Sequence, residues 1–242
     1  MNKKRLPLAL GILSMNLVVM SASVVGAAIA AIAKSFPTEP ISKVQMLSTI
    51  PQLGQVIATL IFTWLTYKMT RKNIGILAVL FVTIGGVIPA FFNSSLNLIL
   101  ACMIAIGFGT GLISNVGPVL VQEHFEGEER ATVMGWQVGF NSIGMMAMTA
   151  IGGWLGSSNW RNLFCVYIFG VVILIAAYFL IPQDKRVTET KNKEGKGSFF
   201  ATLKHVNPMV YIYLLITFFI SIAMTMFMAN QSIVLSTKGL GT

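Results

Sequence analysis

Residues 73–122 read NIGILAVLFVTIGGVIPAFFNSSLNLILACMIAIGFGTGLISNVGPVLVQ and contain no charged residue. A helix needs about 20 apolar residues to cross a bilayer, because each residue advances it by about 1.5 Å. This stretch is too long for one crossing, and Pro89 with the polar run Asn93-Ser94-Ser95 divides it into two. The sequence therefore predicts two consecutive transmembrane helices joined by a short turn.

The remainder of the chain shows the same pattern. Further charge-free stretches cover residues 6–33, 44–67, 131–160, 162–183 and 206–237. Charged residues make up 10% of the chain and apolar residues 55%, whereas soluble domains carry about 25% charged residues. The first stretch is too long for the apolar core of a signal peptide, which is about 7–15 residues. We therefore expect an all-α integral membrane protein with seven transmembrane helices.

The Lys and Arg residues indicate how these helices are oriented. With a cytoplasmic N-terminus, only Lys34, Lys43, Arg161 and Lys238 of the 17 basic residues fall outside. The positive-inside rule therefore predicts that the N-terminus is cytoplasmic. The net charge of +9 follows from this distribution and favours contact with anionic lipid, not nucleic acid. The short termini suggest the inner (plasma) membrane of a bacterium.

The second and fifth predicted spans resemble each other. Six residues recur 90 positions later: Gly54 as Gly144, Thr59 as Thr149, Ile61 as Ile151, Trp64 as Trp154, Leu65 as Leu155 and Arg71 as Arg161. The two copies run in opposite directions in the expected topology. This pattern indicates a 3+3 inverted repeat, as in transporter folds that bind substrate near the midplane. The alternative is chance identity between two apolar segments.

Several of these residues resemble motifs of the major facilitator superfamily, in particular its drug-exporter-like branch. Residues 63–72 read TWLTYKMTRK, in which Leu65, Arg71 and Lys72 match the family's pattern after span two, while Tyr67 replaces its Asp. Met103 stands where the fourth span of the family has Arg, and Thr149 stands where the antiporter motif has Pro. The glycines that match the family's spaced glycines are expected to pack helices closely: Gly107, Gly109, Gly111, Gly144, Gly152 and Gly153.

The resemblance implies a domain organisation. Residues 1–182 would form the N-terminal six-helix bundle, 183–207 a basic cytoplasmic loop between domains, and 208–242 the first helix of a C-terminal bundle. Because such transporters have about twelve spans, we expect a chain that stops here to be incomplete and unable to transport by itself. The resemblance also implies a cytoplasmic gate that includes Arg71 and Lys72, in which Arg71 pairs with Glu123 while Arg130 competes for the same acid.

The predicted spans offer only neutral polar groups to a substrate. The candidates are Asn16, Gln52, Gln55, Asn115, Gln137, Asn141, Asn230 and Gln231. We favour Asn16, Gln55, Asn115, Asn141 and Asn230, because Gln137 is expected near the inner surface. A buried amide needs a hydrogen-bond partner, which substrate or water can supply. The alternative is that these amides hold helices together.

The acidic residues all lie outside the predicted spans: Glu39, Glu123, Glu126, Glu128, Glu129, Asp184, Glu189 and Glu194. The sequence therefore predicts no enzyme, no metal site and no cofactor. We expect alternating-access transport of a small molecule, with efflux of neutral or lipophilic compounds as the main interpretation and uptake of a sugar or metabolite as the alternative. Any coupling to protons would use groups in the other half of the transporter. A seven-helix receptor is disfavoured by the cytoplasmic N-terminus.

Overall fold

The structure is a computed structural model that describes residues 5–92, 95–156 and 159–183, together with 209, 211–213, 215–220 and 222–223. Six helical segments of the described residues are long and apolar enough to cross a membrane: Leu6–Gly26, Ile41–Lys68, Arg71–Phe91, Leu96–His124, Gly127–Gly156 and Trp160–Leu180. They coincide with the first six predicted spans. The chain is thus an all-helical, multi-pass membrane protein.

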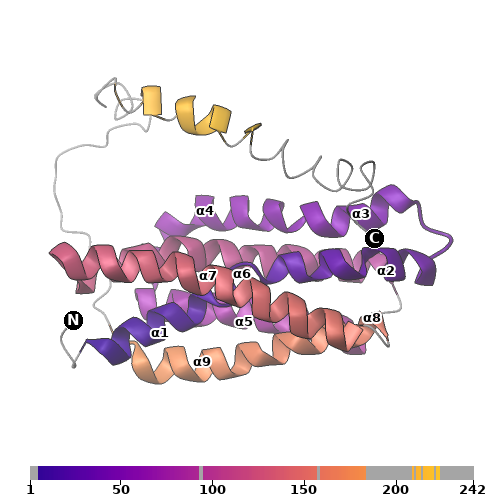
Figure 1. Ribbon diagram of the computed structural model, residues 1–242, viewed down its shortest axis with the longest axis horizontal. Coiled ribbons are helices and arrows are strands. Elements are labelled where there is room, and N and C mark those ends of the chain that lie inside the picture. Colours follow the sequence, from indigo (N-terminus) through magenta and orange to yellow (C-terminus); the bar gives the residue numbers. More distant parts are fainter. Residues whose placement is uncertain are drawn as a thin grey trace. The chain divides into compact units, whose positions relative to one another are not determined.

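The bundle of residues 5–183 has eleven helical elements among its described residues (Figure 1). The elements are α1 (Leu6–Asn16), η1 (Ser21–Ala28), α2 (Ile29–Ser35), α3 (Ile41–Thr49), α4 (Pro51–Lys68), α5 (Arg71–Phe91), α6 (Leu96–His124), α7 (Gly127–Gly156), α8 (Trp160–Leu163), η2 (Phe164–Ile168) and α9 (Phe169–Leu180). Here η marks a 3₁₀ helix. Helix α5 ends at Phe91 and α6 begins at Leu96, so the long apolar stretch is divided in the predicted region, and Pro89 lies inside the last turn of α5.

Helix α6 occupies the centre of the bundle formed by residues 5–183. It packs along α4 and α5 and also contacts α1, while α9 packs on α1 and α5. Buried aliphatic side chains such as Val82, Ile106 and Ile113 fill the space between these helices. By contrast, α7 is mostly exposed and carries Val138, Met146 and Trp154 on its surface, as expected for a helix that faces lipid or further protein.

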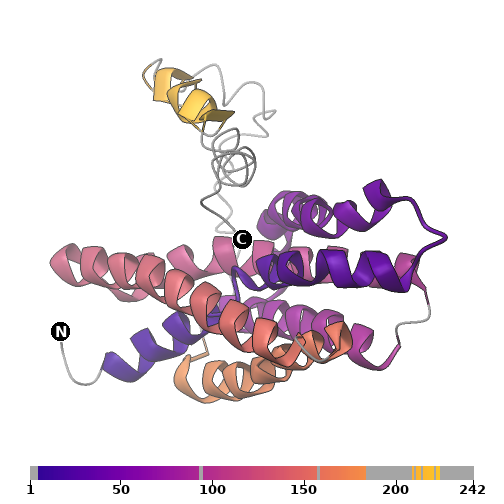
Figure 2. The ribbon, with the colours of Figure 1, turned by 45° about the vertical axis from the view of Figure 1, so that its right-hand side comes forward.

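The first predicted span is not one continuous α-helix. Its α part ends at Asn16, and residues 17–28 form turns and a 3₁₀ helix with bonds such as Val19 N to Asn16 O and Ser23 N to Met20 O. The side chains of Ser14 and Asn16 bond to carbonyls of the preceding turn, which competes with regular helix geometry. Figure 2 shows α1 and α2 as two helical pieces joined by a narrower segment.

Close helix approaches occur at most of the predicted packing glycines. A Cβ atom added to Gly107 or Gly111 would meet α4, one on Gly109 would meet α5, and one on Gly144 or Gly152 would meet the first span. Gly153 differs, because nothing among the described residues lies within 4 Å of such an atom. The prediction for Gly153 is therefore not matched by the geometry.

The seventh predicted span, residues 206–237, lies largely outside the described residues. Within it, the described residues include the apolar helical segment Tyr211–Ile220. Seven spans are thus not confirmed, and neither is the inverted repeat. The proposed limits at residues 182 and 207 likewise stay predictions.

Candidate functional site

Two amide side chains, Asn16 from α1 and Gln137 from α7, lie beside Gly117 of α6. A Cβ atom on Gly117 would lie 3.0 Å from Nε2 of Gln137 and 3.8 Å from Nδ2 of Asn16. Asn16 and Gln137 are 4% and 6% exposed, and Asn141 follows one helical turn after Gln137 on the same face of α7. We call Asn16, Gln137 and Asn141 the amide cluster.

The amide cluster has unused hydrogen-bonding capacity. Nδ2 of Asn16 donates to the carbonyl of Ile12 at 3.0 Å. In contrast, Nε2 of Gln137 and Oδ1 of Asn141 are buried and find no hydrogen-bond partner among the described residues. Leaving such a group unpaired costs about 1–3 kcal/mol, so a bound polar molecule that pairs with both groups would be stabilised here.

Gln137 and Asn16 lie equally far along their helices. Helix α7 begins at Gly127 and α1 at Leu6, so Gln137 and Asn16 each lie about 15 Å from the start of their helix. The two side chains consequently reach the same depth. The signal that points to Gln137 is its spacing of four residues from Asn141, which puts both amides on one face of a helix.

Gln55 and Asn115 belong to a second polar group, between α4 and α6. Nε2 of Gln55 donates to Oγ1 of Thr110 at 3.2 Å, and Nδ2 of Asn115 donates to Oγ1 of Thr59 at 3.1 Å. Asn115 also donates to the carbonyl of Gly111 at 2.7 Å. Unlike the amide cluster, these amides already bond to a neighbouring helix, which is the structural role that polar residues commonly have in membranes.

The end of the bundle that carries the α4–α5 and α6–α7 turns holds the predicted gating residues. Nη2 of Arg71, at the start of α5, lies 2.6 Å from Oε1 of Glu123, at the end of α6. The Arg71 side chain is only 16% exposed, and its Nε is buried without a hydrogen-bond partner among the described residues. Lys72 does not join this pair, and its Nζ lies 5.0 Å from the centre of the Tyr178 ring on α9.

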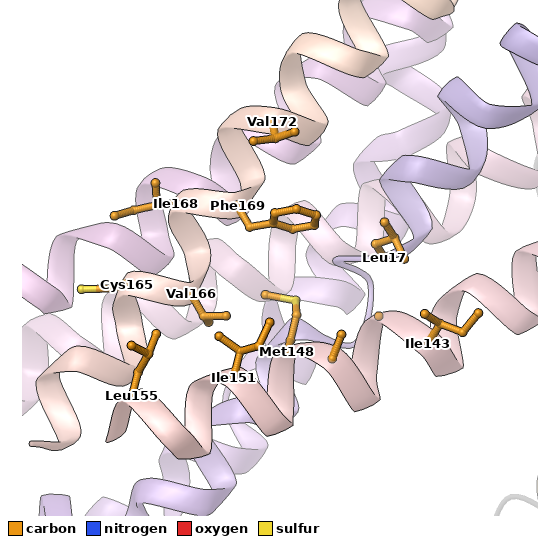
Figure 3. A pocket seen from close by; sticks show the side chains of 12 residues that line it. Leu17, Ile143, Met148, Ile151, Leu155, Cys165, Val166, Ile168, Phe169 and Val172 are labelled. Carbon is orange, nitrogen blue, oxygen red and sulfur yellow. The ribbon is translucent and has the colours of Figure 1, made fainter. Parts of the chain in front are cut away.

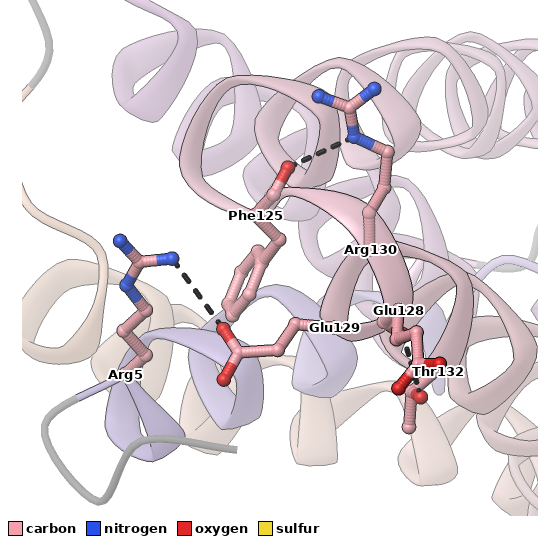
Figure 4. Close-up of polar contacts among 6 residues, drawn as sticks. All are labelled: Arg5, Phe125, Glu128, Glu129, Arg130 and Thr132. Atoms are coloured by element: carbon pink, nitrogen blue, oxygen red, sulfur yellow. Dashed lines mark hydrogen bonds and ion pairs between the residues drawn. The ribbon is translucent and has the colours of Figure 1, made fainter.

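Arg130 is not the competitor for Glu123 that the sequence suggested. Its Nε donates to the carbonyl of Phe125 at 2.9 Å, and its Nη2 donates to the carbonyl of Gln122 at 3.0 Å. Figure 4 shows the bond from Arg130 to the carbonyl of Phe125. It also shows the ion pair between Arg5 Nη1 and Glu129 Oε2, which lie 3.4 Å apart. Arg130 thus pairs with a carbonyl in the last turn of α6 and with that of the residue after this helix, and it holds the turn into α7.

The remaining predicted residues are distributed as follows. Gln52 lies on the exposed face of α4, where it lines a shallow hollow with Gln55 and Thr59. Asn230 and Gln231 lie outside the described residues. No group of three or more His, Cys, Asp or Glu residues in the described chain is arranged to hold a metal ion.

Comparison with known proteins identifies the family. The profile of the Major Facilitator Superfamily matches residues 11–241. The chain therefore belongs to the Major Facilitator Superfamily, a family of transporters and not of enzymes.

Individual relatives are sugar–proton symporters. The chain is 25% identical over 143 residues to the arabinose-proton symporter of Escherichia coli (strain K12), covering 58% of this chain and 30% of that protein. A solved proton:xylose symporter bound to 6-bromo-6-deoxy-D-glucose superposes with a TM-score of 0.67 at 16% identity, covering 74% of this chain and 45% of that one. A D-xylose-proton symporter gives a TM-score of 0.59 at 18% identity, covering 75% and 48%.

The solved structures show the fold that the chain shares with these transporters, and the chain spans about half of their length. The expected drug-exporter-like branch is not confirmed, since these relatives are sugar symporters. The departures at Met103 and Thr149, noted above as mismatches to family motifs, agree with this outcome.

Proposed function

We propose that the protein takes part in alternating-access uptake of a small, neutral, hydroxyl-bearing solute such as a sugar. The observation that carries the proposal is the amide cluster, with two buried polar atoms on α7 that have no hydrogen-bond partner in the described part of the chain. The names of the relatives support a sugar as the class of solute.

The chemistry of the amide cluster suits a hydroxyl group. Gln137 offers a free N–H donor and Asn141 a free carbonyl acceptor, and a hydroxyl group can accept from one and donate to the other. No charged side chain belongs to the cluster, so an ionic substrate would find no counter-charge there. Transport of a neutral polyol follows more naturally from this arrangement than transport of a lipophilic compound.

Replacing Gln137 or Asn141 with alanine should reduce uptake of the transported sugar. Each replacement removes one hydrogen bond to the bound solute, worth about 0.5–1.5 kcal/mol, which corresponds to a loss of up to about tenfold in kcat/KM. The measurement is uptake of radiolabelled arabinose, xylose and glucose by cells that express the transporter from its complete coding sequence.

Ser142→Ala is the matched control for these variants. Ser142 follows Asn141 on α7 and is exposed. Among the described residues, its hydroxyl donates only to the carbonyl of Val138 in the same helix. Uptake should be unchanged in this variant. Equal losses in all three variants, or no uptake of any sugar tested, would contradict the proposal.

Export of neutral compounds is the alternative direction. Loading the same cells with a lipophilic dye and following its release separates export from uptake, because an exporter accelerates release while sugar uptake stays at background.

Proton coupling is proposed to use groups outside the described spans. Away from the helix ends, those spans contain no Asp or Glu.

We also propose that Arg71 and Glu123 form a gate at their end of the bundle. Arg71→Ala should increase backbone hydrogen exchange in residues 68–75 and 120–126. The expected cost lies between about 1 kcal/mol, the upper value for an exposed ion pair, and about 3 kcal/mol, the lower value for breaking a buried one. Exchange mass spectrometry of the purified protein measures this directly.

The control for the gate is Lys68→Ala. Lys68 is a nearby cation whose Nζ lies 5.9 Å from the centre of the exposed Trp64 ring, so its loss should leave exchange in residues 120–126 unchanged. The gating role fails if Arg71→Ala and Lys68→Ala have the same exchange profile as the unmodified protein.

A further inference from the structure

An apolar groove runs along the surface of the bundle between α7 and the segment formed by η2 and α9. Its volume is about 520 Å³, and Leu17 of the first span lies at its floor. Figure 3 shows Met148 and Ile151 on α7 and Val166 and Phe169 on the opposite segment, which point into the space between the two helices. Gln137 and Asn141 do not line it, so the groove is separate from the amide cluster.

The groove has the length of one bilayer leaflet. On α7 it extends from Ile143 to Leu155, which is about 18 Å along a helix at 1.5 Å per residue. Half of a hydrocarbon core is about 15 Å. The lining side chains are hydrocarbon or sulfur throughout, so nothing in the groove would repel an acyl chain.

The groove is open to the side, within the membrane-spanning part of the bundle. Ile143, Ile168 and Val172 on its rim are about half exposed, at 57%, 50% and 57%. At this depth of a bilayer, the medium outside the protein is hydrocarbon. If the groove stayed empty, its lining side chains would lack dispersion contacts on that side. In a bilayer, lipid acyl chains are available to make these contacts.

A cation lies beyond one end of the groove. Arg161 is exposed and stands four residues before Cys165, which lines the groove. Its guanidinium lies 5.8 Å from the centre of the Trp160 ring, and Nε1 of Trp160 donates to Oγ of Ser35 at 2.8 Å. No described residue forms an ion pair with Arg161. Arg and Trp at a helix end are placed as in membrane interfaces, where an Arg can pair with a lipid phosphate.

We infer that this groove holds one acyl chain of an anionic phospholipid, whose phosphate contacts Arg161. The shape of the groove fits the acyl chain, and the positive charge of Arg161 attracts the phosphate. The site is independent of the proposed transport, because none of its residues belongs to the amide cluster or to the Arg71–Glu123 pair.

Native mass spectrometry of the purified protein, titrated with phosphatidylglycerol or phosphatidylethanolamine, tests the inference. The unmodified protein should retain one phosphatidylglycerol in preference to phosphatidylethanolamine. Ala147→Phe fills the groove and should abolish retention. Ala101→Phe is the matched control, because Ala101 is also an exposed alanine that lines an apolar hollow, the smaller one between α5 and α6.

The charge is tested separately. Arg161→Gln should weaken retention of phosphatidylglycerol about fivefold, the effect of one basic residue near an anionic lipid. Lys34→Gln removes an exposed cation of α2 that does not line the groove and should have no such effect. If Ala147→Phe is not monodisperse, Ile151→Trp replaces it.

Three results would overturn the inference. The first is that the unmodified protein retains no phospholipid. The second is equal retention in Ala147→Phe and Ala101→Phe, which would place the lipid elsewhere. The third is that the groove binds a neutral lipophilic compound and excludes phosphatidylglycerol, which would mean that the groove serves a different ligand.

Discussion

Replacing Gly144 with valine should destabilise the bundle by about 3 kcal/mol, whereas the same replacement at Gly153 should have little effect. A Cβ atom on Gly144 would meet the carbonyl oxygen, the Cα and the carbonyl carbon of Leu17. Overpacking typically costs about 1–3 kcal/mol. The upper value applies because the obstacle is main chain, which cannot turn aside as a side chain can.

Gly153 is a closely matched control for this change. It lies on the same helix, and no described atom would come within 4 Å of its Cβ. Thermal unfolding of the detergent-solubilised protein, followed by size-exclusion chromatography, measures both variants. Equal melting temperatures for Gly144→Val and Gly153→Val would show that α7 does not pack on Leu17 as described.

Replacing Tyr167 with alanine should cost about 3–5 kcal/mol, the range for removing a large aromatic side chain from a packed interior. Tyr167 is 1% exposed, and its ring packs against Gly86 of α5. Its hydroxyl donates to the carbonyl of Ser21 at 2.8 Å, where the first span has changed to a 3₁₀ helix. Tyr167 therefore anchors the irregular part of that span from η2.

Two further variants serve as controls. One distinguishes the contribution of the Tyr167 ring from that of its hydroxyl, and the other measures the effect of removing an exposed tyrosine. Tyr167→Phe keeps the ring and should cost only about 1 kcal/mol, the value of one hydrogen bond. Tyr178→Ala removes a tyrosine of α9 that is 56% exposed and should cost less than Tyr167→Ala. A small loss of thermal stability in Tyr167→Ala, similar to that of Tyr178→Ala, would contradict the anchoring role.

The helices were predictable because the absence of charge over about 20 residues is a requirement of the bilayer itself. The division between α5 and α6 followed from local composition, and the Arg71–Glu123 contact followed from the resemblance of residues 63–72 to a family motif. The break after Asn16 was not predictable, because it depends on main-chain bonds and on Tyr167, which is distant in sequence.

The amide cluster was only partly predictable. Asn16 and Asn141 were among the favoured residues, but depth along a helix depends on where that helix starts, and α7 starts at Gly127. Asn115 and Gln55 carry the same chemistry in the sequence, and only the packing of α4 on α6 shows that their amides are already paired.

The most direct measurement is equilibrium binding of tritiated arabinose, xylose and glucose to the purified protein by scintillation proximity, with the Gln137→Ala and Ser142→Ala variants beside it. We expect saturable binding of at least one sugar, weakened up to about tenfold by Gln137→Ala and unchanged by Ser142→Ala. Saturable binding that Gln137→Ala leaves unchanged would place the sugar away from the amide cluster, and no binding of any of the three would contradict a sugar as the solute.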